Sequence, residues 1–324
     1  MIVNFNGGKW LWQSVHSLLS QTETDFECFI VDNGSTDGSM GTLPKLDKRF
    51  IKMELGENTG FARANNIAAK KAKAPWIALL NPDAFARPDW LEQLLIAKNT
   101  SLNTMMVGST QYLALEEIPT LDGFGDCYSI FGIAYRAAHK KLPPQNLKTA
   151  FVFGPCAAAA LYHREKFLNL GGFDERFFCY HEDVDLAFRM QLTGAECVQS
   201  TKAIVDHVSS AISDTVPEFA VYHGTRNRIW TFFKNMPWPL LILLTPLHIS
   251  ANLAYLGWSI FRKGRLRPTF RGIKDGIKGL PQTFRDRKTV QQKRIVSASE
   301  MLGKMTLSPI KVITRGISTR TLPK

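Results

Sequence analysis

The N-terminal part of the chain alternates short apolar runs with segments of helical spacing, and this alternation restricts the folds that are open to it. The expected strands cover residues 1–3, 26–31 and 76–80, and the expected helices cover residues 9–20, 61–73 and 89–98. Such alternation predicts an α/β fold in which a mostly parallel, Rossmann-like sheet is flanked by helices. Asp89, which follows Pro88, is expected to cap the third of these helices.

Three acidic segments occur in a fixed order and can meet at one rim of this sheet. They are VDNGSTDGS (31–39), LLNPDA (79–84) and YHEDVDL (180–186). The first two follow apolar runs, and the third precedes a helical pattern, so each can lie at the rim where α/β sheets bind ligands. A turn that holds a nucleotide, a carboxylate that holds a metal and a carboxylate that acts as a base are what the transfer of a sugar from a nucleoside diphosphate needs.

The first half of the chain offers candidates for nucleotide binding. Asp32 ends an apolar run, where its carboxylate can accept hydrogen bonds from a pyrimidine imide, and Gly34 permits a tight turn. Asn58 and Gly60 precede a helix start, where a diphosphate or ribose can bind. Asn65 is unfavourable inside an Ala-rich helix, which indicates a polar contact. The alternatives are an ordinary Asx turn at Asp32 and surface positions for the asparagines.

The later acidic residues suit metal binding and proton transfer. Asp83 lies just past a buried strand, and Mg²⁺ or Mn²⁺ needs only one or two protein carboxylates when diphosphate oxygens complete its shell. His207 follows another strand and can add a ligand, although a structural histidine is an equal alternative. Asp183 stands at a helix start beside Glu182, where it can act as general base. The alternative is an acidic helix N-terminus that complements the helix dipole, which is how we interpret Asp185.

The net charge of +12 conceals a division of the chain. Residues 1–225 hold 20 Lys and Arg against 25 Asp and Glu, whereas residues 226–324 hold 20 against 3. We therefore expect a mildly acidic catalytic domain over 1–225 and a strongly basic C-terminal tail over 226–324. Such a tail is typical of proteins that bind an anionic membrane surface or nucleic acid.

The segment 238–261 contains no Asp, Glu, Lys or Arg. Its length permits a membrane span. Pro239 and Pro246 inside it, with basic residues on both sides, instead favour a kinked hairpin or pair of interfacial helices on the cytoplasmic leaflet; a true span and a buried core helix are the alternatives.

The start MIVNFNGGKW has no basic n-region, and five scattered cysteines predict free thiols in a reducing compartment. We expect a peripheral or monotopic protein at the cytoplasmic face of the inner (plasma) membrane.

The ordered motifs VDNGSTDGS, ENTGFARANN, LLNPDA, GGFDERFF and HEDVDLAFR, preceded by VNFN, resemble family 2 inverting glycosyltransferases of the GT-A fold. The rhamnosyltransferase-like group is the most similar, and the resemblance covers about residues 1–210. It implies transfer of a sugar from a nucleotide donor with inversion, usually with a divalent metal. The basic part of the chain after Trp238 also resembles the membrane-associating end of transferases that build cell-surface polysaccharide on polyprenyl carriers.

The resemblance assigns roles to residues that match the motifs. It places the metal and diphosphate at Asp83 and His207, and the base at Asp183 of the Glu182–Asp183 pair. The remaining matched positions would hold the nucleotide and its sugar: Val3, Asn4, Asp32, Asn58, Gly60 and Asn65. The chain departs from the family in a short first strand, in Asn81 where many relatives have Asp, and in the absence of a QxxRW motif, which argues against a processive synthase.

The expected function is inverting transfer of a sugar, with rhamnose from dTDP-rhamnose favoured by the resemblance alone, to a lipid-linked glycan in cell-surface polysaccharide synthesis. One alternative is transfer of another hexose from a UDP-sugar. Two further alternatives are an inactive protein that only binds sugar nucleotides and a nucleic-acid-binding protein. The uncharged apolar segment argues against the last, so no nucleic acid partner is expected.

Overall fold

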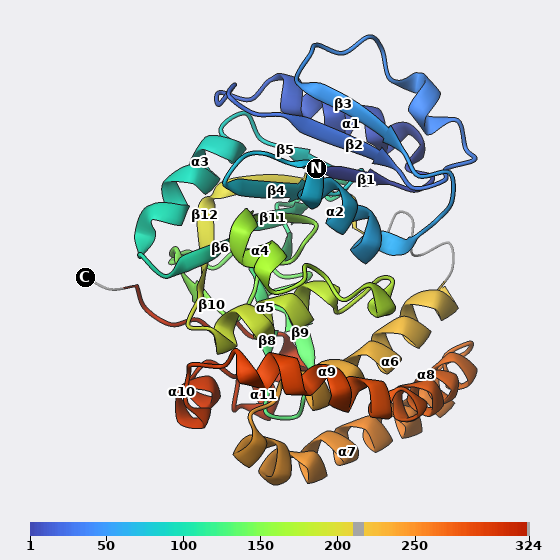
Figure 1. Cartoon of the computed structure of the whole chain (residues 1–324), viewed down its shortest axis with the longest axis vertical. Helices are drawn as coiled ribbons and strands as arrows, with labels where there is room; N and C mark the ends of the chain where they lie inside the picture. Colours follow the sequence, from blue (N-terminus) through green and yellow to red (C-terminus); the bar gives the residue numbers. More distant parts are fainter. Residues whose placement is uncertain (210–216, 323–324) are drawn as a thin grey trace.

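The computed structural model describes residues 1–209 and 217–322, and Figure 1 shows its arrangement of sheets above a layer of C-terminal helices. The helices are α1 (Gly8–Leu19), α2 (Gly60–Lys71), α3 (Trp90–Ala97), α4 (Arg164–Asn169), α5 (Glu182–Leu192), α6 (Pro217–Asn235), α7 (Trp238–Ile260), α8 (Leu266–Lys278), α9 (Leu280–Gln292), α10 (Ala298–Gly303) and α11 (Pro309–Thr314). The expected α/β fold with C-terminal helices is confirmed.

A three-stranded parallel sheet forms the N-terminal edge of the molecule. It consists of β3 (Phe50–Glu54), β2 (Cys28–Asp32) and β1 (Ile2–Asn4). The amide of Leu80 donates a hydrogen bond of 3.0 Å to the carbonyl oxygen of Met1, so the sheet continues onto β4 (Trp76–Leu80). This continuity places the C-terminal ends of β1 and β2 near the residues that follow β4.

The larger sheet is mixed. Its order is β10–β12–β6–β11–β4, with β5 on β12 and β7 on β6. The pair β12–β6 is parallel, whereas β11 runs antiparallel between β4 and β6. A separate hairpin joins β8 to β9. The bounds are β5 (Ala84–Ala86), β6 (Thr104–Leu113), β7 (Leu121–Gly123), β8 (Asp126–Tyr128), β9 (Ala134–Arg136), β10 (Ala150–Val152), β11 (Ala159–His163) and β12 (Glu196–His207).

All the strands and helices expected within residues 1–98 are present, with shifts of a few residues at their ends. Strand β3 was not expected, because its sequence FIKME lies on a largely exposed sheet edge and carries little apolar character. Asp89 is the N-cap residue of α3, as expected, but its side chain makes no capping hydrogen bond. Its backbone has φ −99° and ψ 8°, outside the extended region from which a cap side chain reaches the first helical amides.

The segment 226–324, expected as a basic C-terminal tail with apolar helices, folds into helices that pack against the rest of the molecule. Phe188 of α5 packs in one buried cluster with Phe232 of α6, Leu240 of α7 and Met301 of α10. The chain then returns to the catalytic part, where Arg320 pairs with Phe151 through backbone hydrogen bonds. Most basic side chains of these helices are exposed, although Arg228, Lys234 and Arg287 are buried, and apolar side chains of the helices contribute to the core. The 225/226 boundary falls inside α6.

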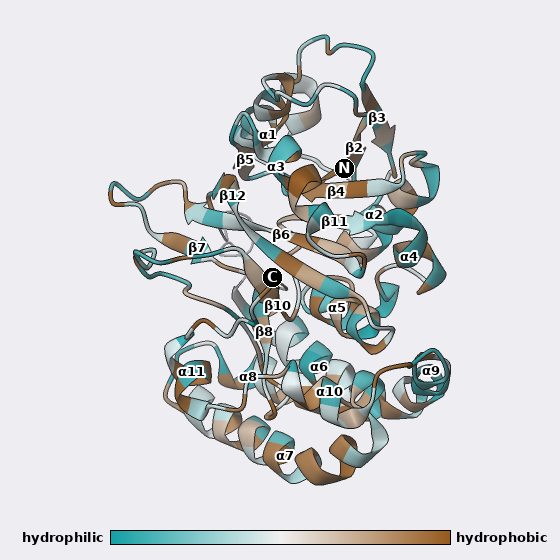
Figure 2. Ribbon diagram, turned by 90° about the vertical axis from the view of Figure 1, so that its left-hand side faces the viewer, coloured by the Kyte–Doolittle hydropathy of each residue, from teal (hydrophilic) through white to brown (hydrophobic). Residues whose placement is uncertain are grey.

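The uncharged segment forms the single helix α7 rather than a hairpin within residues 238–261. By length and composition α7 could cross a membrane. One flank, including Leu244 and His248, is buried against the body of the protein on both sides of Pro246, and this packing keeps the helix continuous. The other flank is exposed, and Figure 2 shows α7 as a largely apolar helix at the end of the molecule.

A buried ion cluster ties α5 to α6. The carboxylate of Asp185 accepts hydrogen bonds from Lys234 Nζ at 2.9 Å and from Arg189 Nε at 2.8 Å. Lys234 Nζ also donates to Asp174 at 2.8 Å, and Asn235 donates to Asp185 at 2.8 Å. Asp185 lies in the first turn of α5, as its interpretation as a residue that complements the helix dipole requires, and its side chain is in addition fully buried and paired.

Replacing Lys234 with Met is expected to lower the free energy of unfolding by about 3–5 kcal/mol, because it leaves the Asp185 and Asp174 carboxylates buried with less positive charge. Urea unfolding followed by circular dichroism measures the change. The control is Lys288→Met on α9, an exposed lysine, for which a change within about 0.5 kcal/mol is expected. Equal stability of the two variants would contradict a structural role for the cluster.

Candidate active site

The ends of β1 and β2 form a hydrogen-bonded turn that contains three of the expected nucleotide-binding residues. Asn4 Nδ2 donates to Ser35 Oγ at 3.0 Å and lies 3.4 Å from Asp32 Oδ1. The Ser35 amide donates to Asp32 at 3.3 Å. Asn33 Nδ2 donates to Asn58 Oδ1 at 3.0 Å, so the loop before α2 joins the same turn. Val3, on β1, is a buried core residue in this structure.

Gly60 and Asn65 have local structural partners. Gly60 has φ +84°, and a Cβ atom there would lie 2.6 Å from the ring of Phe178, so only glycine fits this close approach. Asn65 is buried, and its amide donates to the carbonyl oxygen of Phe61 within α2. Its neighbour Asn66 exchanges two hydrogen bonds with the backbone of Phe173, which attaches the GGFDERFF segment to α2.

Sheet pairing brings together the two residues expected to bind a metal. Strand β5 begins directly after Asp83, and β12 ends at His207, which pairs with Ala84 in the antiparallel register of these strands. As a result His207 Nε2 lies 3.3 Å from Asp83 Oδ1, although 124 residues separate them in the sequence. Both side chains are almost fully buried.

A third carboxylate, not anticipated from the sequence, completes this group. Asp122 of β7 is fully buried, and its Oδ2 lies 2.8 Å from Nδ1 of His207. Burial alone would raise the pKa of Asp122, but Arg136 and the two neighbouring histidines, His139 and His207, hold it well below its usual range. Burial lowers the pKa of His207, and hydrogen bonds with Asp122 and Asp83 outweigh this effect and raise the pKa to about 9.

The Asp83–His207 pair fits a divalent cation. Within the described residues, Nε2 of His207 is buried without a hydrogen bond of good geometry, and it faces the Asp83 carboxylate. A carboxylate oxygen and an imidazole nitrogen are ligands of Mn²⁺ and related ions, and a diphosphate would supply the remaining oxygens. The donor set therefore matches the expected cofactor.

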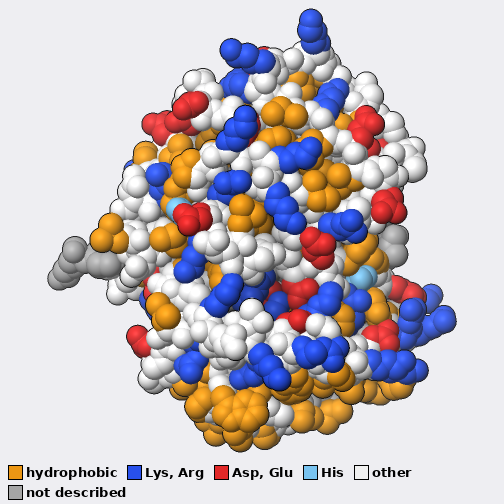
Figure 3. Space-filling model, in the orientation of Figure 1, with side chains coloured by type: hydrophobic (Ala, Val, Ile, Leu, Met, Phe, Trp, Pro, Cys, Tyr) orange, Lys and Arg blue, Asp and Glu red, His pale blue; other side chains and the backbone are white. Residues whose placement is uncertain are grey.

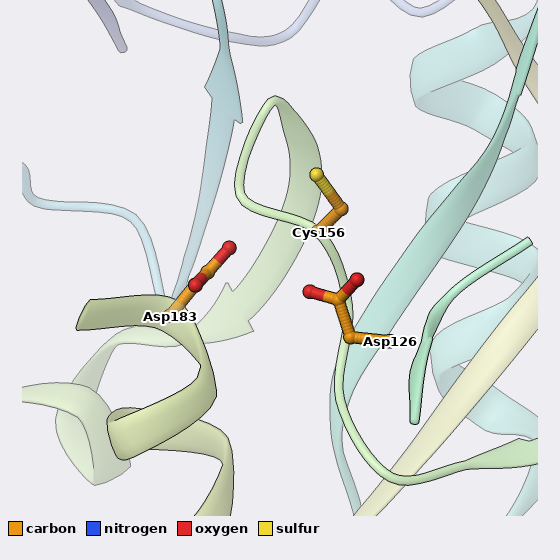
Figure 4. A group of neighbouring side chains, drawn as sticks. All are labelled: Asp126, Cys156 and Asp183. Carbon is orange, nitrogen blue, oxygen red and sulfur yellow. The ribbon is translucent and has the colours of Figure 1, made fainter. Parts of the chain in front are cut away.

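Asp183, the expected base, lies partly exposed at the start of α5, beside the buried side chains of Asp126 and Cys156 (Figure 4). Its Oδ2 accepts a hydrogen bond from the amide of Ala157 at 3.1 Å, and ligand atoms of Asp126, Cys156 and Asp183 all lie within 4.8 Å of one another. Burial raises the pKa of Asp183. Burial and the charge of Asp183 raise the pKa of Asp126 to about 7 despite the opposing effect of Arg136.

These three side chains have the spacing of metal ligands, but the positive charge beside them disfavours a cation. Arg136 Nη2 lies 3.0 Å from Cys156 Sγ, and its guanidinium also pairs with Asp122. Burial raises the pKa of the Cys156 thiol to about 12, so this thiol stays protonated at neutral pH. We therefore interpret Asp126 and Asp183 as a carboxyl pair suited to accepting a proton.

Glu182 differs from its neighbour Asp183. Burial, followed by the nearby charge of Asp183, raises the pKa of Glu182 well above its ordinary value. Its Oε2 is buried, without a hydrogen-bond partner among the described residues. Burial and a neighbouring carboxylate thus both favour the protonated form of Glu182.

The loop before Asp183 is strained and is held by α6. Phe178, Tyr180 and His181 have positive φ values of 65°, 68° and 66°, which non-glycine residues rarely adopt. Asn227 of α6 donates to the carbonyl oxygens of this loop at 2.7 to 3.0 Å, and the acceptors are Phe177, Cys179 and Tyr180. The C-terminal helices thus fix the backbone that leads to the expected base.

Sequence reasoning missed Asp122, Asp126, Arg136 and Cys156. The first three come from residues 111–150, where no strand or helix period is visible. The signal available there was LDGFGD, in which two aspartates flank two glycines. Gly125 in this stretch has φ +75°, so the backbone turns sharply between the two acidic positions.

The N-terminal part of the chain matches a known protein family. Residues 1–117 match the model of "Glycosyl transferase family 2". This part of the chain is a family 2 glycosyltransferase domain. The chain is 28% identical over 250 residues to "N-acetylglucosaminyl-diphospho-decaprenol L-rhamnosyltransferase" of Mycobacterium tuberculosis, covering 68% of this chain and 80% of that protein. The resemblance to a rhamnosyltransferase-like group is thereby confirmed.

Another relative is "O-antigen biosynthesis protein RfbC" of Myxococcus xanthus, 30% identical over 220 residues; the match covers 63% of this chain but spans only 17% of that protein. Two solved structures have a similar fold. GalNAc-T7 with UDP, GalNAc and Mn²⁺ gives a TM-score of 0.57 at 17% identity, over 72% of this chain and 47% of that one. Staphylococcus aureus TarS gives a TM-score of 0.58 at 15% sequence identity, and the match covers 90% of this chain and 51% of the TarS chain. The expected GT-A fold is confirmed.

The Asp126–Asp183 pair gives a prediction for the pH dependence of the transferase. Two close carboxyls share a proton, so Asp183 is fully ionised only after the last proton leaves the pair near pH 7. Asp126→Asn removes the like charge and should shift the acidic limb of the kcat/KM profile to lower pH by about one unit. Cys156→Ser, which keeps both carboxyls, should leave the limb in place. An unchanged limb in Asp126→Asn would contradict the coupling.

Proposed function

We propose that the protein is a metal-dependent, inverting glycosyltransferase that moves a sugar from a nucleoside diphosphate to a hydroxyl of a lipid-linked glycan. The observation that supports this most is one connected polar network with two ends. Asp83, His207 and Asp122 form one end, and Asp126 and Asp183 lie at the other. Arg136 joins them through its contacts with Asp122 and Cys156.

In this proposal the chain holds the donor and positions a base. Asn4, Asp32 and Asn58, from one turn, bind the nucleotide through their amide and carboxylate groups. Asp83 and His207 hold Mg²⁺ or Mn²⁺, which would neutralise the negative charge of the leaving diphosphate. An imidazole ligand favours Mn²⁺ over Mg²⁺.

Asp183 takes the proton from the acceptor hydroxyl as its oxygen forms the new bond to the anomeric carbon. The bond from that carbon to the diphosphate oxygen breaks in the same displacement, and the electron pair leaves with the diphosphate. A single displacement inverts the anomeric centre and needs a base but no protein nucleophile. Burial raises the pKa of Asp183, which makes its carboxylate a stronger base than that of an ordinary aspartate.

We favour rhamnose, from dTDP-rhamnose, as the donor sugar, with a UDP-hexose as the alternative. The support is the Mycobacterium relative, whose name specifies an L-rhamnosyltransferase that acts on a diphospho-decaprenol sugar. The same name supports a polyprenyl-linked acceptor in cell-surface polysaccharide synthesis.

We further propose that the exposed flank of α7 rests on the cytoplasmic leaflet of the plasma membrane. Ile242, Ile249, Leu253 and Ile260 recur at helical spacing, and each is at least 50% exposed. Figure 3 shows this apolar surface at one end of the molecule, with a band of Lys and Arg beside it. Apolar residues beside basic ones fit an interfacial helix on anionic lipid, with each basic residue near the surface contributing about 1 kcal/mol.

The transferase proposal is tested by Mn²⁺-dependent release of nucleoside diphosphate from a panel of sugar nucleotides, in the presence of a polyprenyl-linked acceptor. One donor should turn over, and Asp183→Asn should reduce kcat about 10²- to 10⁴-fold while donor binding persists. Asp206→Asn, a surface residue paired with Arg87, should leave the rate unchanged. Absence of binding to every donor would contradict the proposal, and binding without turnover would favour an inactive sugar-nucleotide-binding protein.

The membrane proposal is tested by co-sedimentation of the full chain with phosphatidylglycerol-containing and pure phosphatidylcholine vesicles. Binding should require the anionic lipid, weaken with salt, and fall about tenfold or more in Leu253→Glu, since an exposed leucine contributes about 1.5–3 kcal/mol when buried. Ile96→Glu, at an exposed position on α3, is the matched control. Equal binding of both variants would contradict a docking role for α7.

A further inference from the structure

Asp122 holds one side of the His207 ring while the other side faces Asp83. Its Oδ2 lies 2.8 Å from Nδ1 of His207, and Nε2 on the opposite edge of the ring lies 3.3 Å from Asp83 Oδ1. Asp122 is fully buried on β7, and its carboxylate also contacts Arg136 and, at 3.1 Å, His139. The carboxylate is therefore fixed from three directions.

This contact determines which ring nitrogen of His207 is available. An ionised carboxylate has only hydrogen-bond acceptors, so the hydrogen in the contact must sit on Nδ1 of His207. In a neutral ring Nε2 then carries the free lone pair. That atom is buried and, among the described residues, has no hydrogen bond of good geometry. A metal-ligating histidine in proteins is commonly oriented in this way by a carboxylate on its other nitrogen.

We propose that Asp122 is a positioning residue for the divalent cation: it fixes the ring of His207 with Nε2 directed toward Asp83 and the cation between them. This rests on the proposed metal-dependent function. Asp122 does not itself ligate the ion, because its contact is with the far edge of the ring. Its effect passes entirely through His207.

The purely structural alternative is that Asp122 serves only to neutralise buried Arg136. The two roles differ in what they predict for metal binding. If Asp122 only pairs with Arg136, its loss changes folding stability and leaves the intrinsic affinity for Mn²⁺ intact in the folded protein. If Asp122 orients His207, its loss lowers the affinity for Mn²⁺, and this effect is seen only when His207 is present.

The test is the affinity of the purified full chain for Mn²⁺ alone, measured from the electron paramagnetic resonance signal of free Mn²⁺ without donor or acceptor. Asp122→Asn should weaken binding about 10- to 100-fold. An asparagine amide can donate to Nδ1, which moves the ring hydrogen to Nε2 and removes the lone pair. His139→Ala, which removes a different partner of the same carboxylate, should change the affinity less than about threefold.

A double-mutant cycle isolates the route through His207. His207→Ala should weaken Mn²⁺ binding, and adding Asp122→Asn to it should produce no further loss. Equal losses from Asp122→Asn with and without His207 would overturn the proposal, as would wild-type affinity in Asp122→Asn. If Asp122→Asn does not fold, Asp122→Glu is the second variant, because it keeps the negative charge that faces Arg136 but displaces the carboxylate oxygen from Nδ1 of His207. We expect Asp122→Glu to bind Mn²⁺ about tenfold more weakly than the wild type. An affinity equal to that of the wild type would overturn the proposal.

Failure of the underlying metal site gives a separate result. If Asp83→Asn and His207→Ala both bind Mn²⁺ as well as the wild type, the cation does not lie between these residues, and the proposed function loses its metal site. If these two variants lose affinity while Asp122→Asn does not, the metal site stands and only the positioning role of Asp122 is rejected.

Discussion

The ion cluster around Asp185 is the interaction on which the placement of the active site depends. Asp185 lies two residues after the proposed base Asp183, on the same helix, and its carboxylate is clamped by Lys234 of α6 and by Arg189. Breaking a buried ion pair is strongly destabilising, because the remaining charge stays buried without a partner and without hydration. The position of α5 relative to α6 is therefore closely determined, and with it the position of the proposed base.

The same helix α6 also sets the loop that precedes the base. Backbone strain at Phe178, Tyr180 and His181 persists only where the surroundings overdetermine it. Asn227 supplies that constraint through three hydrogen bonds to the carbonyl oxygens of the loop. Ionic and hydrogen-bonding contacts from one helix thus converge on residues 177–185, so the C-terminal segment helps to build the proposed active site.

The sequence predicted the local elements well because they depend on local patterns: apolar runs ended by turns, and helical spacing between them. It also predicted that Asp83 and His207 belong together, although only the register of β5 on β12 makes them neighbours. Asp122, Asp126 and Arg136 could not be predicted, because their strands are short and their partners are distant in sequence. The composition of residues 226–324 did not reveal how they pack, since most of their basic side chains are exposed while apolar side chains and a few buried basic ones, such as Lys234, contact the rest of the protein.

The α6–α7 contact connects the two proposed activities of the chain. Arg228 of α6 donates to Asn252 of α7, and the ring of His248 stacks on Phe232 with ring centroids 4.1 Å apart. The face of α6 that includes Asn227 holds the loop before the proposed base, while α7 turns its exposed flank to the surface. Because α6 contacts both the loop before the proposed base and α7, docking of α7 on a membrane would set the height and orientation of that base above the lipid. A polyprenyl-linked acceptor is constrained by the same surface, so membrane attachment would restrict which of its hydroxyls can reach Asp183.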